Sequence, residues 1–294
     1  MLVRQVRELL RIERSETVVD ATVGLGGHAT MFADAVGPDG LLVGLDVDPD
    51  NLASARERLS GCCCRVELLQ CNFRDLPAAL GSIGVERVDV LFADLGVSST
   101  QLDLADRGFS FMRDGPLDMR MDPRLTVTAA DLINRLKERE LGDLIYHSSQ
   151  ERASRRIARR ICERRRGSRI TTTGQLAKLV AEVLGVNPAS RKSKIHPATR
   201  TFQALRIAVN DEIGALDALL AAGADVLKPG GRFGLVAFHS VEDRPVKLAF
   251  RKGKSEGIYR LLTKKPVVAD EEERLANPRS RSAKLRVAVR LPEQ

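Results

Sequence analysis

The chain has 294 residues, of which 43% are hydrophobic and 29% charged, and its formal net charge is +8 at pH 7. This length and balance predict a soluble globular protein with one large domain or two small ones. No apolar run reaches the roughly 18 residues that a membrane span needs, so we expect no membrane association. A first strand is expected to begin by about Thr17, which leaves no room for a cleavable targeting peptide, and we expect a cytoplasmic location.

Short β-branched runs alternate with helical segments over the first hundred residues. Helices are expected over 28–36 and from Pro49 onward, because proline suits the first turn of a helix. Strands that alternate with helices predict an α/β fold whose parallel sheet is joined by right-handed crossovers. The expected strands are 17–22, 41–46, 65–70, 88–93, 233–238 after a turn at 227–232, and a late antiparallel strand at 284–290.

The middle of the chain loses this alternation. Residues 126–195 have helical periodicity, which predicts a helical insert. After it we expect one long helix whose apolar face carries Phe202, Leu205, Val209, Ile213, Leu216 and Leu220. Between Glu151 and Arg169 there are nine arginines against two glutamates. Since the guanidinium fork suits phosphate, this excess predicts a nucleic-acid partner, although a solvated helix face would show the same pattern.

The five cysteines do not suggest a disulfide framework in a chain of this length. Cys62, Cys63 and Cys64 are consecutive, and the chain contains no Cys-x-x-Cys pair of the kind that structural zinc sites use. We therefore expect small, buried, reduced thiols and no metal.

A glycine cluster follows the first expected strand, in the segment Asp20–His28. Glycines there permit a tight turn and let a ligand approach the peptide groups. Asp46 ends the second strand, where its carboxylate can accept hydrogen bonds from ribose hydroxyls. This pattern predicts a nucleoside cofactor. Gly24-x-Gly26-x-x-Ala29 also fits the dinucleotide fingerprint, so a nicotinamide cofactor and S-adenosylmethionine both remain open at this point.

The segment from Asp94 to Asp122 has no regular periodicity and mixes Asp, Arg, Phe and Met. A long structured loop at the carboxyl end of a strand is where an open α/β sheet places its chemistry. This loop also carries the longest part of a resemblance to a known family. The segments that match are Asp20–His28, Asp94–Ser99 with Gln101, Arg107–Asp122, Lys194–Gln203, Lys228–Gly231, Phe238–Ser240 and Asn277–Arg286.

These segments closely resemble the bacterial 16S ribosomal RNA (cytosine-N4)-methyltransferase H family, also called MraW, over nearly the whole chain. The resemblance implies methyl transfer from S-adenosylmethionine to N4 of a cytidine at the decoding centre of the small ribosomal subunit. It implies a Rossmann-like class I methyltransferase core at 1–110 and 200–294, with a helical substrate-binding insert at 111–199. The family's cofactor positions fall on Gly26, Gly27, His28, Asp46, Phe73, Asp94 and Gln101. The partner would be 16S rRNA, and a homodimer is left open.

The chemistry of a cytosine amine suggests further roles. The lone pair of this amine is delocalised into the ring, so an acceptor for its N–H bond assists attack on the methyl group. We expect Asp94 to be that acceptor, with Ser98 and Ser99 as further hydrogen-bonding groups. Asp118 is an alternative acceptor for the proton. The expected substrate contacts are Phe109 and Phe111, either of which could stack the base or anchor the loop in the core, together with His196, Arg200 and His239.

Three segments depart from the family pattern. Residues 1–4 lack the His and Pro with which members usually begin, His147–Arg152 replaces a Tyr-Gly-Glu-Glu-Arg segment, and the stretch after Arg251 is short. The altered N-terminus keeps a ribosome- or RNA-binding relative without catalysis open as a rival, beside the nicotinamide-dependent oxidoreductase that the glycine pattern allows.

Overall fold

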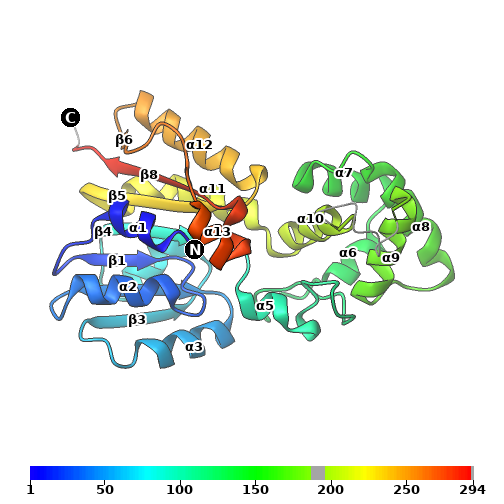
Figure 1. Cartoon of the computed structure of the whole chain (residues 1–294), viewed down its shortest axis with the longest axis horizontal. Helices are drawn as coiled ribbons and strands as arrows, with labels where there is room; N and C mark the ends of the chain where they lie inside the picture. The colour runs from blue at the N-terminus through cyan, green and yellow to red at the C-terminus, as the bar shows by residue number, and fades with distance from the viewer. Residues whose placement is uncertain (187–195, 293–294) are drawn as a thin grey trace. The chain divides into compact units, whose positions relative to one another are not determined.

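The computed structural model describes residues 1–186 and 196–292, so Lys194 and Ile195 of the matched segments lie outside the described residues. The chain forms two compact units (Figure 1). The α/β unit comprises Met1–Gly96 and Ile213–Gln294, and the insert unit comprises Val97–Glu212. Residues 97–110 and 200–212, which the sequence prediction assigned to the core domain, therefore belong to the helical unit.

The described part of the α/β unit is built on an eight-stranded sheet with the order β3-β2-β1-β4-β5-β8-β6, in which β7 also pairs with β8. The first five strands are parallel and β8 runs antiparallel to β5, so the predicted α/β class is confirmed. The strands are β1 Thr17–Asp20, β2 Leu41–Asp46, β3 Arg65–Gln70, β4 Val88–Asp94, β5 Leu227–Ala237, β6 Tyr259–Leu261, β7 Val267–Val268 and β8 Lys284–Arg290.

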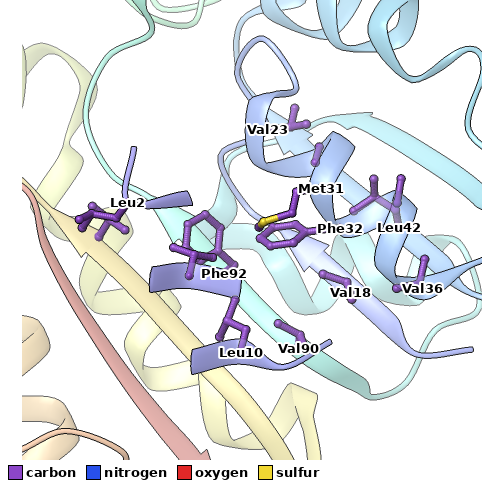
Figure 2. Close-up of a cluster of buried hydrophobic side chains, with 14 of the residues drawn as sticks. Leu2, Leu10, Val18, Val23, Met31, Phe32, Val36, Leu42, Val90 and Phe92 are labelled. Atoms are coloured by element: carbon purple, nitrogen blue, oxygen red, sulfur yellow. The ribbon is translucent and has the colours of Figure 1, made fainter. Parts of the chain in front are cut away.

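Alternate residues of the central strands enter two separate cores, one on each face of the sheet. Val18 and Phe92 belong to one core, whereas Val19 and Leu91 belong to the other. Figure 2 shows the first core, where Phe32 packs edge-on to Phe92 with ring centroids 5.3 Å apart. The strand period of two thus explains why both faces require helices.

The helices of the α/β unit divide between these two cores. Helices α1 Val3–Leu10, α2 Gly27–Val36 and α3 Pro49–Leu59 contribute to the core of Figure 2. Helices α4 Leu76–Ser82, α11 Glu212–Val226 and α12 Ser240–Ser255 contribute to the other core. A short α13 covers Glu271–Ala276, and single 3-10 turns cover Phe73–Asp75 and Pro278–Ser282. The start of α3 follows from its sequence, because the Asp48 side chain accepts the N–H of Asp50 and Pro49 takes the first helical position.

The insert unit has its own apolar core, formed by helices together with the loop of residues 104–128. Its helices are α5 Ser99–Asp103, α6 Ala129–Arg135, α7 Glu138–Ser149, α8 Ser154–Gly167, α9 Thr173–Leu184 and α10 Thr199–Asn210, with a 3-10 turn at Ala105–Arg107. Leu117 and Met119 of the loop are fully or almost fully buried there. The loop is thus packed into the insert unit, whereas a linker would lie outside its core.

The predicted long helix over Phe202–Leu220 is wrong, because the helix is broken at Asp211. This residue adopts a left-handed backbone with φ of 47° and ends α10 before α11 begins. Leu205 then packs in the insert core, whereas Leu216 packs in the core of the α/β unit. A single helical spacing of apolar residues in the sequence therefore supplies side chains to two different cores.

Two smaller predictions also need correction. β5 begins at Leu227, so the residues expected to form a turn at 227–232 are part of the strand, and the register shifts where β4 pairs with it. Cys63 is exposed, against the expectation that every thiol is buried. None of the helices described here is long and apolar enough to cross a bilayer.

Candidate active site

The turn after β1 requires glycine at two positions. Gly24 has φ of 50° and Gly26 has φ of 81°, a region that residues with a Cβ rarely adopt. A Cβ on Gly26 would also lie 3.4 Å from the Cα of Ala55 in α3. Helix α2 starts at the next residue, so this turn brings a helix N-terminus to the carboxyl end of the sheet.

Asp46 ends β2 and is held by the glycine turn. Its Oδ2 accepts the N–H of Gly24 at 3.0 Å and Nδ2 of Asn51 at 3.1 Å, and its Oδ1 accepts the N–H of Asp48 at 2.9 Å. Burial raises the pKa of Asp46 to about 6 despite these donors. A carboxylate has about four acceptor positions, so it retains capacity for a hydroxyl donor such as a ribose.

Asp20 ends β1 and is 1% exposed. It accepts the N–H of Thr22 at 3.2 Å. Burial raises its pKa to about 7, the charge of His28 opposes the rise, and Asp94 and Asp46 add to it. Carboxylates at the ends of three neighbouring strands therefore repel one another in a dry environment, which favours a positively charged ligand.

Asp94 ends β4 beside the buried ring of His28. Its Oδ2 lies 3.4 Å from Nε2 of His28, and its main-chain N–H donates to Oγ1 of Thr22 at 2.7 Å. The main-chain nitrogen of Met1 lies 3.2 Å from Nε2 of His28 and 3.7 Å from Oδ2 of Asp94. Oδ1 of Asp94 and Nδ1 of His28 are buried without a hydrogen-bond partner in the part of the chain that the structure describes. Buried polar atoms of this kind call for a partner, and a ligand can supply one.

These residues fit S-adenosylmethionine better than a dinucleotide. S-adenosylmethionine carries a sulfonium and an ammonium group and no phosphate, so it suits a site with Asp20, Asp46 and Asp94 at its strand ends. A pyrophosphate would bring further negative charge against the same carboxylates. Of the two cofactors that the glycine pattern left open, the three carboxylates thus favour S-adenosylmethionine.

The start of the insert unit uses two predicted site residues for local structure. The hydroxyl of Ser98 accepts the N–H of Gln101 at 3.2 Å, and Oε1 of Gln101 accepts the N–H of Ser98 at 3.0 Å. This capping box begins α5 and Gln101 is 3% exposed. Ser99 is the first residue of α5 and is exposed. Ser98 and Gln101 therefore have a structural role that the sequence prediction did not anticipate.

The two phenylalanines of the loop lie in different surroundings. Phe109 is 7% exposed and belongs to the insert core, so its placement contradicts the hypothesis that it stacks a base. Phe111 is half-buried and stacks on His196 with ring centroids 4.3 Å apart. The rings of Phe111 and Phe202 form a T-shaped pair with centroids 4.9 Å apart. Phe111 and His196, both predicted to contact substrate, thus form one aromatic platform within the insert unit.

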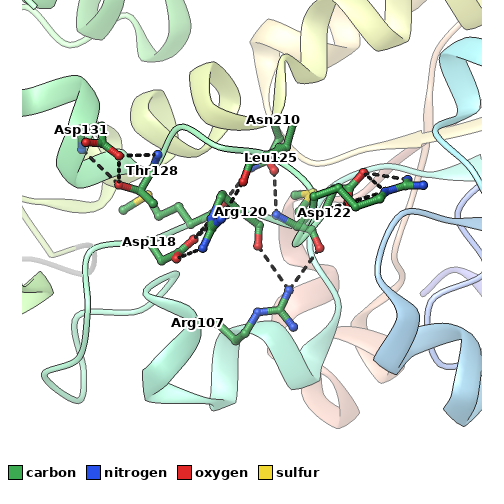
Figure 3. Close-up of polar contacts among 11 residues, drawn as sticks. Arg107, Asp118, Arg120, Asp122, Leu125, Thr128, Asp131 and Asn210 are labelled. Carbon is green, nitrogen blue, oxygen red and sulfur yellow. Dashed lines mark hydrogen bonds and ion pairs between the residues drawn. The ribbon is translucent and has the colours of Figure 1, made fainter. Parts of the chain in front are cut away.

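Asp118 and Arg120 form a two-point ion pair in the centre of the loop (Figure 3). Oδ1 of Asp118 accepts Nε of Arg120 at 2.8 Å and Oδ2 accepts Nη2 at 2.7 Å. Burial opposes ionisation of Asp118, but the hydrogen bonds from Arg120 outweigh it and keep the pKa of Asp118 below its ordinary value. A carboxylate held in this way is a weak base, so the arrangement favours a structural role over the predicted proton acceptor.

Neighbouring contacts make the same loop rigid. Arg107 donates to the carbonyl oxygens of Arg120 and Met121, each at 3.2 Å. Asn210 of α10 accepts the N–H of Met121 at 2.7 Å and donates to the carbonyl of Met119 at 2.8 Å. Together with the Asp118–Arg120 pair, these hydrogen bonds fix the loop within the insert unit.

The remaining predicted site residues are spread over both units. Phe73 begins a 3-10 turn after β3 in the α/β unit. His239 precedes α12 and its ring nitrogen Nε2 lies 3.0 Å from Glu242. Arg200 is exposed on α10 of the insert unit, 3.9 Å from Glu151. The sequence prediction missed Thr22 and Asn51, which hold Asp94 and Asp46. Thr22 lies two residues after β1 and Asn51 lies in the first turn of α3, and their proximity to strand ends that carry Asp was the available signal.

The comparisons with known proteins agree with this geometry. The family model described as the MraW methylase family matches residues 1–291. The chain is 47% identical to a ribosomal RNA small subunit methyltransferase H of Acidobacterium capsulatum over 98% of this chain and 96% of that protein. It is 52% identical to the protein of the same name from Prochlorococcus marinus, over 94% and 86% of the two chains.

Solved structures resemble the chain more distantly. An rRNA methylase of Streptococcus thermophilus aligns with 99% of this chain and 94% of its own, at 14% identity and a TM-score of 0.43. The assignment therefore depends on the sequence relatives and the family model. Together they confirm the predicted family and its cofactor: the chain belongs to the MraW methylase family and is an S-adenosylmethionine-dependent methyltransferase.

Proposed function

We propose that this enzyme transfers a methyl group to N4 of a cytidine in 16S rRNA, at the decoding centre of the small ribosomal subunit. The loop segment Arg107–Asp122 and the segment Asp94–Ser99 support this specificity, because they match the family motifs residue by residue. The names of the relatives support ribosomal RNA of the small subunit as the substrate.

The observation that carries the chemistry is the side chain of Asp94. One of its oxygens is buried and has no protein partner in the described chain, while the other faces His28. S-adenosylmethionine supplies a methyl group bonded to a positively charged sulfur. Asp94 accepts an N–H bond of the cytosine amine, which keeps the nitrogen lone pair directed at the methyl carbon. On methylation the amine nitrogen must lose a proton, and the Asp94 carboxylate would accept it.

The other residues hold the reactants. Asp46 accepts the ribose hydroxyls, and the glycine turn at Gly24 and Gly26 leaves room for the nucleoside. Asp20, whose pKa is about 7, adds negative charge opposite the cationic cofactor once it ionises. Phe111, supported by the ring of His196, forms an aromatic platform on the insert unit that suits stacking of an RNA base. Ser99, Arg200 and His239 remain proposed contacts to the RNA.

The test is methyl transfer to small subunits that lack the modification, using labelled S-adenosylmethionine and mass mapping of the modified nucleotide. The Asp94→Asn variant should lower kcat at least a hundredfold while its affinity for S-adenosylmethionine, measured by calorimetry, stays within tenfold. Asp34→Ala, an exposed change on α2, is the matched control and should transfer normally. Near-normal transfer by Asp94→Asn would remove Asp94 from the reaction, and a methyl group on another nucleotide would refute the proposed target. Binding of rRNA without any transfer by the wild-type chain would favour the non-catalytic relative.

A further inference from the structure

Helix α8 of the insert unit has one apolar face and one face made largely of arginine. Ile157, Ala158, Ile161 and Cys162 are buried in the insert core or beside it. The exposed part of Ser154–Gly167 carries six arginines, a seventh, Arg165, is half-buried, and Glu163 is the single acidic residue of the helix. A surface of this charge is costly unless a counter-charge lies close by.

Several of these guanidinium groups already have partners in the protein. Arg155 lies 2.5 Å from a carboxylate oxygen of Asp143, and Arg159 lies 3.6 Å from one of Glu138. Arg165 is half-buried and donates to the carbonyl oxygens that end α6, those of Ile133 at 2.5 Å and Leu136 at 2.7 Å. These three residues hold α8 against α6 and α7, so they are structural.

The others keep their positive charge available. Arg156 donates to the carbonyl oxygen of Val183 at 2.5 Å and Arg164 donates to the hydroxyl of Ser168, and both partners are uncharged. In the described residues neither guanidinium lies within 4.0 Å of a carboxylate. Arg160 lies 3.5 Å from Glu163, the one carboxylate near it in the part of the chain that the structure describes. Both side chains are about half exposed, so this pair neutralises little of the arginine's charge in water.

Arg156, Arg160 and Arg164 follow one another at intervals of four residues. Four residues of α-helix rise about 6 Å, so the three side chains form a stripe along one side of α8. Two members of this stripe, Arg156 and Arg160, line a surface groove of about 450 Å³, together with Arg159, Glu163, Glu182 and Val183. A row of planar donors beside a groove suits an extended chain of anionic groups.

We propose that this arginine stripe, Arg156, Arg160 and Arg164, binds the phosphodiester backbone of the RNA substrate, outside the catalytic residues. The assignment builds on the proposed function, because it takes rRNA as the partner. The stripe is all arginine, and the groove beside it offers a single apolar residue among three arginines and two glutamates. Phosphate oxygens therefore fit it better than an acidic protein surface, which would need apolar contacts as well. Such contacts fix the position of the RNA and carry no sequence information.

The experiment measures binding of a 16S rRNA fragment that contains the decoding centre, by fluorescence anisotropy between 50 and 200 mM salt, with methyl transfer measured in parallel. The double variant Arg156→Gln/Arg164→Gln removes two charges while glutamine keeps helix propensity. The plot of log K against log[salt] should become less steep, with the size of its negative slope reduced by about 1.4 to 1.8. Affinity for the RNA near 0.15 M salt should fall roughly 10- to 30-fold. KM for RNA should rise accordingly, whereas kcat and the calorimetric affinity for S-adenosylmethionine should stay unchanged.

Two further variants sharpen the result. Arg135→Gln in the same unit is the matched control, because Asp131 already lies 3.0 Å from its guanidinium, and the salt slope should not change. Glu182→Gln removes a carboxylate from the groove and should tighten RNA binding. Far-UV circular dichroism checks that each variant is folded.

Several outcomes would overturn the proposal. An unchanged salt slope and KM in the double variant would do so directly. Loss of binding to whole subunits with normal binding to naked rRNA would assign the stripe to a ribosomal protein instead. If the wild type transfers no methyl group to the cytidine while the double variant still weakens RNA binding, the proposed function fails and the RNA-binding surface stands.

Discussion

Replacing Asp118 by asparagine distinguishes a structural ion pair from a catalytic base. The pair is about three-quarters buried, with side-chain exposures of 23% for Asp118 and 28% for Arg120. Its two short hydrogen bonds are charge-assisted, and the main-chain N–H of Arg120 donates to the same carboxylate at 3.0 Å. Asparagine keeps one acceptor oxygen but turns an amide N–H₂ toward the guanidinium. Because the pair is only partly buried, the substitution should cost more than breaking an exposed ion pair and less than breaking a fully buried one. We expect a loss of about 2 kcal/mol in the local free energy of unfolding.

Hydrogen exchange measures this loss at the site. The N–H groups of Ala129 and Ala130 donate to the carbonyl oxygens of Asp118 and Leu117, each at 2.8 Å, so they report opening of the loop. A loss of about 2 kcal/mol should speed their exchange roughly 30-fold. The Asp122→Asn variant is the control, because the guanidinium of Arg124 is 57% exposed and its pair with Asp122 should contribute less than about 1 kcal/mol.

The pH dependence has a defined sign. Since the folded-state pKa of Asp118 is lowered, its contribution is complete above the unfolded pKa of about 4 and is lost as the pH falls through the lower folded value. Asp118→Asn should therefore lose less stability than the wild type on acidification. If exchange at Ala129 and Ala130 is unchanged while kcat collapses and the acid limb of its pH profile disappears, Asp118 is the base and the structural reasoning is refuted.

Three other substitutions test the cofactor site and the aromatic platform. Asp20 holds a proton up to pH about 7 in the fold, so the free energy of unfolding should fall as the pH rises from about 4 to 7. In urea titrations the Asp20→Asn variant should show a smaller decline with pH, and it should bind S-adenosylmethionine more weakly at pH 8. If the variant still loses stability steeply, another titrating group causes the decline. Gly26→Ala should cost about 1–3 kcal/mol and reduce cofactor affinity, because alanine resists φ of 81°; wild-type melting and calorimetry would contradict this. Phe111→Ala should raise KM for RNA about 5- to 150-fold, from a stacking loss of about 1–3 kcal/mol, with cofactor binding intact; weaker cofactor binding would place Phe111 elsewhere.

Much of the α/β unit follows from local patterns in the sequence. The runs at 41–46, 65–70 and 284–290 are strands with the predicted bounds, because alternate residues face two opposite cores and their β-branched side chains favour extended backbone. The glycine turn and Asp46 were also predictable, since only glycine adopts the backbone of this turn readily. The long loop motif was sufficient to indicate the family, because a motif match depends on residue identity and order alone.

Helical periodicity predicted the wrong helix where one apolar pattern continues across both units. The apolar spacing from Phe202 to Leu220 is continuous, yet the helix ends at Asp211 because the residues on either side pack into separate cores. Phe109 and Phe111 are two residues apart in one motif, and only packing separates the buried ring from the one that stacks on His196.

The sequence by itself determined the family, the order of the strands along the chain and the carboxylates at the strand ends, because each depends on residue identity and short-range spacing. Only the tertiary structure decided which of those groups already have partners. Asp118 is held by Arg120, Ser98 and Gln101 cap a helix, and Asp94 keeps a buried oxygen without a partner in the described chain. Thr22 and His28, the residues beside Asp94, come from a distant part of the chain, so spacing alone could not pair them with it. The short spacings of Asp118–Arg120 and Ser98–Gln101 allowed a contact, and only the folded loop shows that it forms.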